Sequence, residues 1–341
     1  MNLLDRSSYN YILPKELIAQ YPLSKRETSR MMVLDKSTQR ISHKTFSDIL
    51  DYLNAGDVLV LNNSKVIPAR LYGKKETGGS VELFLLHKDN SCEWSCLVKP
   101  GKGIVPGSRI KISDNLSAEI ISKNSEGIVR VRFDNPENSE LTYGNVPLPP
   151  YIHRDAEISD TERYQTVYAK HEGSVAAPTA GLHFTESLLE QIKNKGVEIT
   201  EITLHVGLGT FKAVSTDKIN DHKMHAELCE ISRETANTIN EAKKKGGRIL
   251  SVGTTTTRTL ESFYSDGQLA YGTKWTDIFL YPGQPFNVID AQLTNFHMPE
   301  SSLIMLVAGF AGYEFTMKAY DTAIAEKYRF FSYGDCMLVY N

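Results

Sequence analysis

The sequence predicts an α/β protein with a small all-β domain inserted into it. The chain has 341 residues, which is more than one hydrophobic core usually holds. Between about residues 66 and 143, six short strand-like runs follow one another without a helical pattern, and from residue 185 helical and strand patterns alternate. We therefore expect an α/β domain made of residues 1–65 and 146–341, interrupted by a β domain over residues 66–145.

The N-terminal part combines short helix-like pieces with apolar strands. Residues 11–35 contain the helix-like KELIAQ and the strand MMVLD, and residues 46–53 (FSDILDYL) form another helix-like piece that precedes the strand DVLVLN. Arg26 and Arg30 lie four residues apart just before the first strand. Their guanidinium groups could bind phosphate or carboxylate, and surface ion pairs are the alternative.

The middle block has the period of half-buried strands. Its runs are PARLYGKK, GSVELFLLHK, EWSCLVK, SRIKI, LSAEIIS and GIVRVRF, and turn residues separate them. Consecutive short strands without helices are typical of a small barrel or a sandwich. The proline-rich residues 146–168 then lead back to the first domain.

The C-terminal half alternates helices and strands. Thr185 caps the helix ESLLEQIKNK, which is followed by the strand VEITEITLHV, and Ser232 caps the helix RETANTINEAKKK. The strand RILSVG runs directly into TTTTRTLESF. This alternation indicates a sheet or barrel covered by helices.

Composition restricts the function classes. The net charge is −3, so nucleic acid would be bound through a local patch rather than a wide basic face. There is no apolar run long enough to cross a membrane and no export signal, and the four cysteines lack zinc-site spacing, so we expect a cytoplasmic protein without metal. The candidate basic patch, for which a solvated strand surface is the alternative, comprises Lys65, Arg70, Lys74, Lys75, Lys99, Lys102, Arg109 and Lys111.

Two glycine-rich stretches resemble each other in their chemistry. Residues 174–184 (SVAAPTAGLHF) and 203–211 (TLHVGLGTF) each combine small residues, a histidine and a closing phenylalanine. Small side chains let a ligand lie against the backbone, so together the stretches favour a pocket over two packed loops. A dinucleotide site is excluded because TFKAV, not a helix, follows HVGLG. The candidate site residues here are Thr179, His183, Phe184, His205, Gly207, Gly209 and Phe211.

The turn GTTTTR, residues 253–258, lies where a strand ends and a helix begins. Its hydroxyls, including those of Thr254 and Thr255, and the unpaired N–H groups of a helix start could hold an anion, and Arg258 could add a guanidinium fork. Helix capping by the threonines is the alternative reading.

Three further stretches carry candidate residues. DHKMHAE contains His225 and Glu227, for which a hydrogen-bonding or acid–base role is favoured over a metal site. NFHMPESS contains Asn295 and His297 just before an apolar helix. The C-terminal YRFFSYGDCMLVY could stack a flat base on its aromatic and arginine side chains, or could be a core strand, and its candidates are Arg329, Tyr333 and Asp335.

These blocks together resemble a known enzyme family. AAPTAGLHF, TLHVGLGTF, GTTTTRTLES, TNFHMPESSL and YRFFSYGDCML are similar to the signature blocks of the S-adenosylmethionine:tRNA ribosyltransferase-isomerases. The resemblance runs from near residue 9 to near residue 340 and is loosest in the β-rich block. It implies a discontinuous α/β-barrel-like domain with an inserted β-barrel, without metal or a permanently bound cofactor. The modest charge and two-domain size of this cytoplasmic protein allow a monomer.

The resemblance also implies the reaction. S-adenosylmethionine would be the co-substrate that donates its ribosyl group to the aminomethyl group of preQ1 at the wobble position of the tRNA anticodon stem-loop. The products would be epoxyqueuosine-tRNA, adenine and methionine, which makes the family pentosyltransferases. The resemblance does not assign roles to single residues.

The residue types suit this chemistry. Imidazoles titrate near neutral pH, so His183, His205, His225 and His297 are candidate acids and bases. Asp335 and Glu227 could orient them or bind ribose hydroxyls, and Phe184 and Phe211 could enclose a base. The alternatives are an RNA-binding module without catalysis, which would leave the histidine-rich turns unexplained, and a conventional methyltransferase, whose glycine-rich strand-to-helix turn we do not find.

Overall fold

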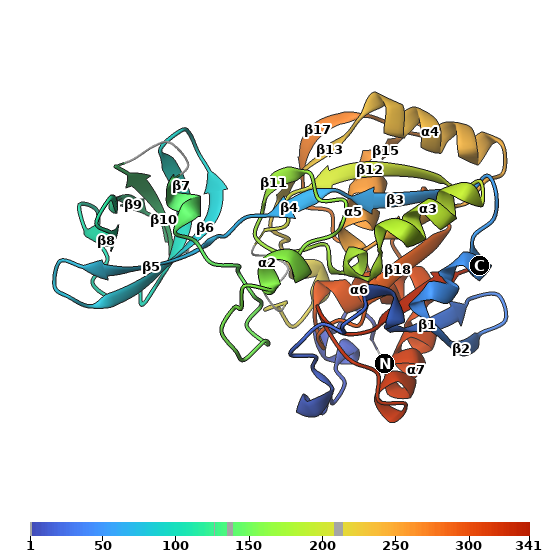
Figure 1. Ribbon diagram of the computed structural model, residues 1–341. Helices are drawn as coiled ribbons and strands as arrows, with labels where there is room; N and C mark the ends of the chain where they lie inside the picture. The colour runs from blue at the N-terminus through green and yellow to red at the C-terminus, as the bar shows by residue number, and fades with distance from the viewer. Residues whose placement is uncertain (1, 126, 135–138, 208–213) are drawn as a thin grey trace.

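The protein consists of a nine-stranded mixed sheet flanked by helices and a separate six-stranded barrel (Figure 1). The computed structural model describes residues 2–125, 127–134, 139–207 and 214–341. The barrel stands to one side of the larger unit, joined to it by the chain segments around β4 and β5 (Figure 1). The α/β fold class with a small all-β barrel is confirmed, and the barrel, not the sandwich, is the correct reading of the β block.

The large sheet contains most of the strands predicted outside the β block. Its pairing order is linear, with β17 and β2 at its ends, whereas the small sheet closes on itself. Strands β12, β3, β14 and β18 are mutually parallel neighbours, and β1 is parallel to β19. In order, the strands are β17 (Gly272–Thr276), β13 (Glu227–Ile231), β12 (Glu198–Leu204), β3 (Val58–Asn62), β14 (Ile249–Val252), β18 (Ala291–Asn295), β19 (Cys336–Tyr340), β1 (Arg30–Asp35) and β2 (Arg40–Thr45).

Both faces of this sheet are covered. In β3, whose sequence is VLVLN, Val58 and Val60 belong to one apolar core while Leu59 and Leu61 belong to the other. A strand that is buried on both faces reads as a continuous apolar run rather than an alternating one. The helices that cover the faces are α3 (Glu186–Asn194), α4 (Arg233–Lys244), α5 (Thr254–Phe263), α6 (Ser302–Ala311) and α7 (Tyr313–Ala325).

The predicted helix starts are present. The Thr185 hydroxyl accepts the Leu188 N–H at 3.2 Å, and the Ser232 hydroxyl accepts the Thr235 N–H at 3.0 Å. The helix-like pieces near the N-terminus are short 3-10 turns, η2 (Lys15–Leu17) and η4 (Phe46–Tyr52). The other short elements are η1 (Arg6–Tyr9), η3 (Arg26–Thr28), η5 (Thr179–His183), η7 (Ile219–Asp221), α1 (Ser139–Thr142), α2 (Asp160–Arg163), and the strand pairs β4 (Ser64–Val66) with β11 (His171–Ser174) and β15 (Tyr264–Ser265) with β16 (Gln268–Leu269).

The six runs of the β block form the closed barrel. Their alternating residues, among them Val81, Leu83 and Leu85, point into a common core. Every neighbouring pair in the barrel is antiparallel. Around the barrel the strands are β10 (Ile128–Phe133), β7 (Glu93–Lys99), β6 (Ser80–Lys88), β5 (Arg70–Lys75), β8 (Arg109–Ser113) and β9 (Leu116–Lys123).

The chain enters and leaves the barrel at one point. The Arg70 N–H donates to the Asn145 carbonyl at 3.2 Å, and the Asn145 N–H donates to the Arg70 carbonyl at 2.8 Å. The two ends of the β block are therefore held side by side.

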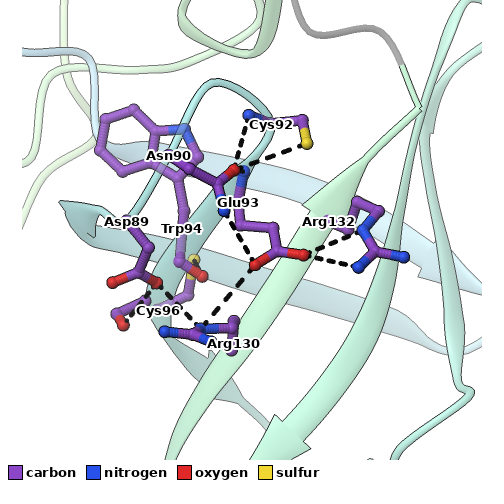
Figure 2. Close-up of polar contacts among 9 residues, drawn as sticks. Asp89, Asn90, Cys92, Glu93, Trp94, Cys96, Arg130 and Arg132 are labelled. Carbon is purple, nitrogen blue, oxygen red and sulfur yellow. Dashed lines mark hydrogen bonds and ion pairs between the residues drawn. The ribbon is translucent and has the colours of Figure 1, made fainter.

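Several charges on the barrel are paired locally. Figure 2 shows Glu93 accepting from Arg132 at 2.7 Å and Arg130 contacting Asp89 at 3.3 Å. Within the candidate basic patch, Lys65 pairs with Glu172, Arg70 with Glu82 and Lys111 with Asp114. Because carboxylates pair with three of its eight cations, the patch is less positive than its sequence suggests.

Cysteines and apolar helices add little to the functional picture. Cys92, Cys96, Cys229 and Cys336 are free thiols. In the described ranges, no His, Cys, Asp and Glu side chains gather in a group of three or more that could hold a metal ion. None of the helices that the structure describes has the length and apolar character needed to cross a membrane.

Candidate functional site

Several sequence blocks that are distant in the chain meet at one cavity, which we call the central cavity. It lies among residues 176–180, 253–255, 294–298 and 331–332, with Val206, Ser301 and Leu303. Tyr151 and Tyr164, from the proline-rich passage, complete it. The glycine-rich turn, the threonine turn and both C-terminal blocks therefore share one site.

Strand direction explains why these turns converge. The parallel strands β12, β3, β14 and β18 all end at the same edge of the sheet, where ligands of α/β proteins bind. Strand β19 is antiparallel to β18, and β1 is parallel to β19, so both of these strands begin at that edge. The turns before β19 and β1 are therefore brought to the ends of the four parallel strands.

The N-terminus of α5 faces the central cavity. Gly253, which has a φ of +89° that favours glycine, turns the chain from β14 into the helix. Thr254 and Thr255 line the cavity, whereas the Thr256 hydroxyl donates to the Val252 carbonyl at 2.7 Å within the helix. The start of α6 adds a second helix N-terminus, because its N-cap Ser301 also lines the cavity. Two positive helix ends thus point toward one space.

Asn62, at the end of β3, fixes part of this threonine turn. It is fully buried, and its Nδ2 donates to the Thr255 hydroxyl at 3.2 Å and to the Leu204 carbonyl at 3.1 Å. Its Oδ1 accepts the Leu204 N–H at 3.1 Å. Asn62 therefore ties β12 to the N-terminus of α5 and holds Thr255 at the cavity wall.

His297 lies in the wall of the central cavity. Its Nε2 is 2.8 Å from the Thr294 hydroxyl, and its backbone N–H donates to the Tyr320 hydroxyl at 2.9 Å. Burial lowers the pKa of His297 from 6.5 to about 3, because the charged imidazolium would lose its hydration. The imidazole is therefore neutral at physiological pH, and the expectation that it titrates near neutrality is wrong for this structure.

Aromatic rings and an unpartnered amide oxygen provide further ligand contacts. The rings of Tyr151 and Phe331 lie 4.7 Å apart between centroids, and the Tyr151 hydroxyl is 2.7 Å from the Ser332 hydroxyl. Asn295 donates to the Phe331 carbonyl at 3.1 Å, while its buried Oδ1 has no hydrogen-bond partner in the part of the chain that the structure describes. Among the described residues, those lining the cavity include no Asp, Glu, Lys or Arg.

His183 lies behind this wall and faces a second, smaller space. Its Nε2 is 3.3 Å from Asn295 Nδ2, and its Nδ1 is 2.7 Å from the Ser29 hydroxyl. A small cavity, which we call the arginine cavity, contains His183, Ser29, Arg26 and Arg163 in its wall. Burial, followed by the charge of Arg26, lowers the pKa of His183 to about 3, so this histidine is also neutral and does not titrate as expected.

His205 and His225 line a third space, the barrel-side cavity, which lies between the barrel and the large sheet. Its wall includes Gly207 and Glu227 together with His87 and Trp94 of the barrel and Trp275 of β17. The Nδ1 atom of His205 is buried without a hydrogen-bond partner among the described residues. Burial, and then the charge of His171, lower the pKa of His205.

Glu227 and Arg258 form a buried ion pair beside this cavity. Arg258 Nη1 donates to Glu227 Oε2, Glu227 Oε1 accepts the Gly207 N–H at 2.9 Å, and both side chains are less than 10% exposed. Arg258 therefore does not extend the threonine turn in the central cavity, as the sequence suggested, but neutralises Glu227. Val206 lies in the walls of both the central and the barrel-side cavities, so a single segment separates the two spaces.

The remaining predicted residues lie outside the central cavity. Phe184 is fully buried in the core against Phe46, so it presents no face to a ligand. Asp335 is also buried and accepts the backbone N–H groups of Arg30 and Arg329, at 2.9 and 2.8 Å, which is a structural role; burial raises its pKa.

Three more candidates contact other parts of the protein. The Arg30 guanidinium lies over the ring of Tyr328 and pairs with Glu326, Arg329 donates to the Tyr21 carbonyl, and Tyr333 donates to Asp160 at 2.7 Å beside the arginine cavity. Gly209 and Phe211 lie outside the described residues.

Sequence reasoning missed several residues that the fold brings to these cavities. Ser29 and Asn62 are polar residues without a local motif, and Tyr151 and Ser332 lie in the proline-rich passage and the C-terminal block but were not among the candidates predicted there. Trp275 lies in an unremarked edge strand, but it is 56% exposed, which is unusual for so large an apolar ring. A search for polar residues directly after predicted strands would have found Asn62.

Comparison with known proteins places the chain in a family. The family described as queuosine biosynthesis protein matches residues 6–339. The chain belongs to the queuosine biosynthesis protein family. The match spans both the large sheet and the barrel, so the three cavities all lie within the residues that match the family.

Curated members of this family are similar over nearly their whole length. A protein of Natranaerobius thermophilus is 52% identical over 340 residues, covering 98% of each chain, and one of Caldanaerobacter subterraneus subsp. tengcongensis is 53% identical over 342 residues, covering 98% of this chain and all of the relative. Both are named S-adenosylmethionine:tRNA ribosyltransferase-isomerase. A crystal structure of S-adenosylmethionine tRNA ribosyltransferase from Thermotoga maritima is 39% identical, with a TM-score of 0.58, and covers 98% of this chain and all of its own.

Proposed function

We propose that this member of the queuosine biosynthesis protein family is an S-adenosylmethionine:tRNA ribosyltransferase-isomerase. It transfers and isomerises the ribosyl group of S-adenosylmethionine onto the aminomethyl group of preQ1 in tRNA, releasing adenine and methionine. The observation that carries the proposal is the convergence of the glycine-rich, threonine-rich and two C-terminal blocks on the central cavity. The names of the similar proteins supply the reaction class.

The central cavity is the proposed site of the sulfonium donor. Its methionine carboxylate would lie at the N-termini of α5 and α6, where N–H groups and the hydroxyls of Thr254 and Thr255 can bind an anion. The sulfonium would lie against the rings of Tyr151 and Phe331, since aromatic faces attract cations. A neutral His297 suits this site, because an imidazolium would repel the sulfonium.

The barrel-side cavity is the proposed entrance for the modified base of the RNA. Trp94 and Trp275 offer aromatic faces, on which extruded bases stack. His205 and His225 are the proposed base and acid of the reaction, because they lie at this cavity and neither is as deeply buried as His183 or His297. A base here would keep the attacking aminomethyl group neutral.

An adenine-release assay tests the function. The protein is incubated with S-adenosylmethionine and preQ1-bearing tRNA, and free adenine and methionine are measured by chromatography. We expect both products in equal amounts. Formation of S-adenosylhomocysteine would indicate methyl transfer, and RNA binding without adenine release would indicate a binding module; either result contradicts the proposal.

A matched pair of variants tests the donor site. Thr254→Val removes a hydroxyl at the cavity, and we expect the KM for S-adenosylmethionine to rise about tenfold, as for the loss of one hydrogen bond to a charged group. Thr256→Val is the control, because that hydroxyl donates to the Val252 carbonyl inside the helix. Equal KM values for the two variants would exclude the Thr254 hydroxyl from carboxylate binding.

A histidine series tests the acid–base roles. His205→Gln and His225→Gln should lower kcat with little change in stability, whereas His183→Gln should act mainly on stability. If both His205→Gln and His225→Gln retain the wild-type kcat, the assignment of these residues is wrong.

We also propose that residues 66–145 form an inserted domain that completes the site. Its support is the paired neck at Arg70 and Asn145 and the barrel's contribution of His87 and Trp94 to the barrel-side cavity.

A further inference from the structure

Arginine side chains without a carboxylate partner surround the arginine cavity. Arg26 donates to the carbonyls of Leu182 and Glu162, both at 3.0 Å. Arg163 donates to the carbonyls of Leu23 and Ser24, at 2.6 and 3.3 Å. Neither guanidinium forms an ion pair with a carboxylate within the described ranges, although both line the same space.

The two guanidinium groups retain donors that could bind a ligand. Their carbonyl bonds use two of the five N–H groups that each guanidinium carries. The Nε atom of Arg163 is buried and has no hydrogen-bond partner in the described part of the chain. A buried donor without a partner is costly, so such a donor beside a cavity is a candidate ligand contact.

The local charges leave the cavity positive. Burial is the largest cause that lowers the pKa of Arg26. Repulsion from Arg163 lowers this pKa further, and it outweighs the attraction of Glu162, which raises the pKa. The nearest other acid groups are already engaged: Asp160 accepts from Arg154 and from Tyr333, and Asp335 accepts two backbone N–H groups. The charge of Arg329 also acts on His183 behind the cavity. An anion between Arg26 and Arg163 would remove their mutual repulsion.

The position of this cavity connects it to the proposed reaction. Ser332 lines both the arginine cavity and the central cavity, and the contact between His183 and Asn295 separates the two spaces. Val206 in turn lies in the wall between the central cavity and the barrel-side cavity. The three spaces therefore form a row, with the proposed donor site in the middle.

We propose that the arginine cavity binds a backbone phosphate of the RNA substrate. An RNA strand that runs along the three cavities would place one base at the barrel-side or central cavity. A neighbouring phosphate of the same strand would then lie between Arg26 and Arg163. Guanidinium forks match phosphate oxygens in geometry, and such contacts fix the register of a nucleic acid without reading its sequence. This inference rests on the proposed function, since it assigns the RNA backbone to the same active face.

Binding measurements that need no turnover test the inference. The probe is a fluorescently labelled anticodon stem-loop RNA carrying preQ1, titrated in fluorescence anisotropy at several salt concentrations. Arg163→Gln should weaken RNA binding about tenfold, the loss of a charge-assisted contact, and should reduce the slope of log Kd against log salt by about 0.7, the value for one contact to a single strand. Arg163→Lys keeps the charge and should retain most of the affinity. Arg40→Gln, on the edge strand β2, is the control with the same change in net charge.

A modified RNA provides a second measurement that does not depend on the variant folding. Stem-loops with a neutral methylphosphonate at one loop position at a time are titrated against the wild-type protein. We expect the methylphosphonate at one loop position to weaken RNA binding to the wild-type protein by the same factor as the Arg163→Gln substitution does. At that position the methylphosphonate should not weaken RNA binding further when the protein carries Arg163→Gln or Arg26→Gln. Thermal unfolding confirms that each variant is folded.

Three results would overturn the inference. The first is RNA affinity within twofold of wild type in both Arg26→Gln and Arg163→Gln. The second is weaker binding of S-adenosylmethionine at unchanged RNA affinity, measured as its Kd by isothermal titration calorimetry without tRNA, which would assign the cavity to the donor's carboxylate. The third is a methylphosphonate scan in which no position weakens wild-type binding. None of these depends on adenine release, so a protein that binds RNA here but releases no adenine would refute the proposed function alone.

Discussion

The two buried histidines should make the α/β part of the protein sensitive to acid. His183 and His297 are 4% and 9% exposed, and burial lowers the pKa of each to about 3. In the unfolded chain an imidazole has a pKa of about 6.5. As the pH falls below that value the unfolded state therefore takes up protons that the folded state does not, and the stability decreases.

The magnitude follows from these pKa values. Each neutral histidine contributes its full stabilisation above about pH 6.5, and the contribution is lost progressively as the pH falls toward 3. At pH 5.0 the free energy of unfolding should be lower than at pH 7.5 by about 2 kcal/mol for each histidine, or by about 4 kcal/mol for both. Burial raises the pKa of Glu261 and Asp335, which favours the folded state in acid and opposes this trend.

Single variants isolate the histidine contribution. The free energy of unfolding is measured by urea titration at pH 7.5 and 5.0, with helical circular dichroism as the signal, because the long helices lie in the same part of the protein as both histidines. In His183→Gln and in His297→Gln, the decrease in stability between the two pH values should be smaller than in wild type by about 2 kcal/mol. His153→Gln, at an exposed position, is the control and should behave as wild type. Comparing two pH values removes the constant cost of each substitution. The reasoning is refuted if both variants keep the full wild-type pH dependence.

Three further predictions concern the framework of the site. Glu227→Gln should destabilise the protein by about 3 kcal/mol, because it leaves the buried Arg258 cation without its carboxylate. Adding Arg258→Met should recover at least half of the lost stability in the same urea assay, and no recovery would mean that the broken ion pair is not the cause of the loss. Gly181→Ala would place a Cβ 2.0 Å from the Tyr168 hydroxyl, so it should lower the Tm by several degrees. Adding Tyr168→Phe should restore part of the loss, because that hydroxyl has no hydrogen-bond partner among the described residues. A Gly181→Ala protein as stable as wild type would contradict this. Replacing residues 71–144 with a short glycine–serine linker should leave a folded α/β protein that has lost turnover, and an unfolded product would show that the barrel is not an independent insertion.

Local patterns in the sequence were sufficient for the individual elements. Alternating apolar residues such as Val81 and Leu83 identified the barrel strands, and the hydroxyls of Thr185 and Ser232 marked helix starts. These signals are local, because a strand period or a helix cap depends on residues a few positions apart. The sequence also identified the blocks that meet at the central cavity.

Tertiary structure alone decided how the candidate residues are shared among the cavities. The sequence treated His183, His205 and His297 as equivalent, but the fold distributes them over three spaces and buries two of them as neutral groups. Burial and ion pairing depend on residues far apart in the chain, as in the contact of Arg258 with Glu227 or of Ser29 with His183. A pKa and a partner are properties of the packed environment, which strand order determines and no local pattern encodes.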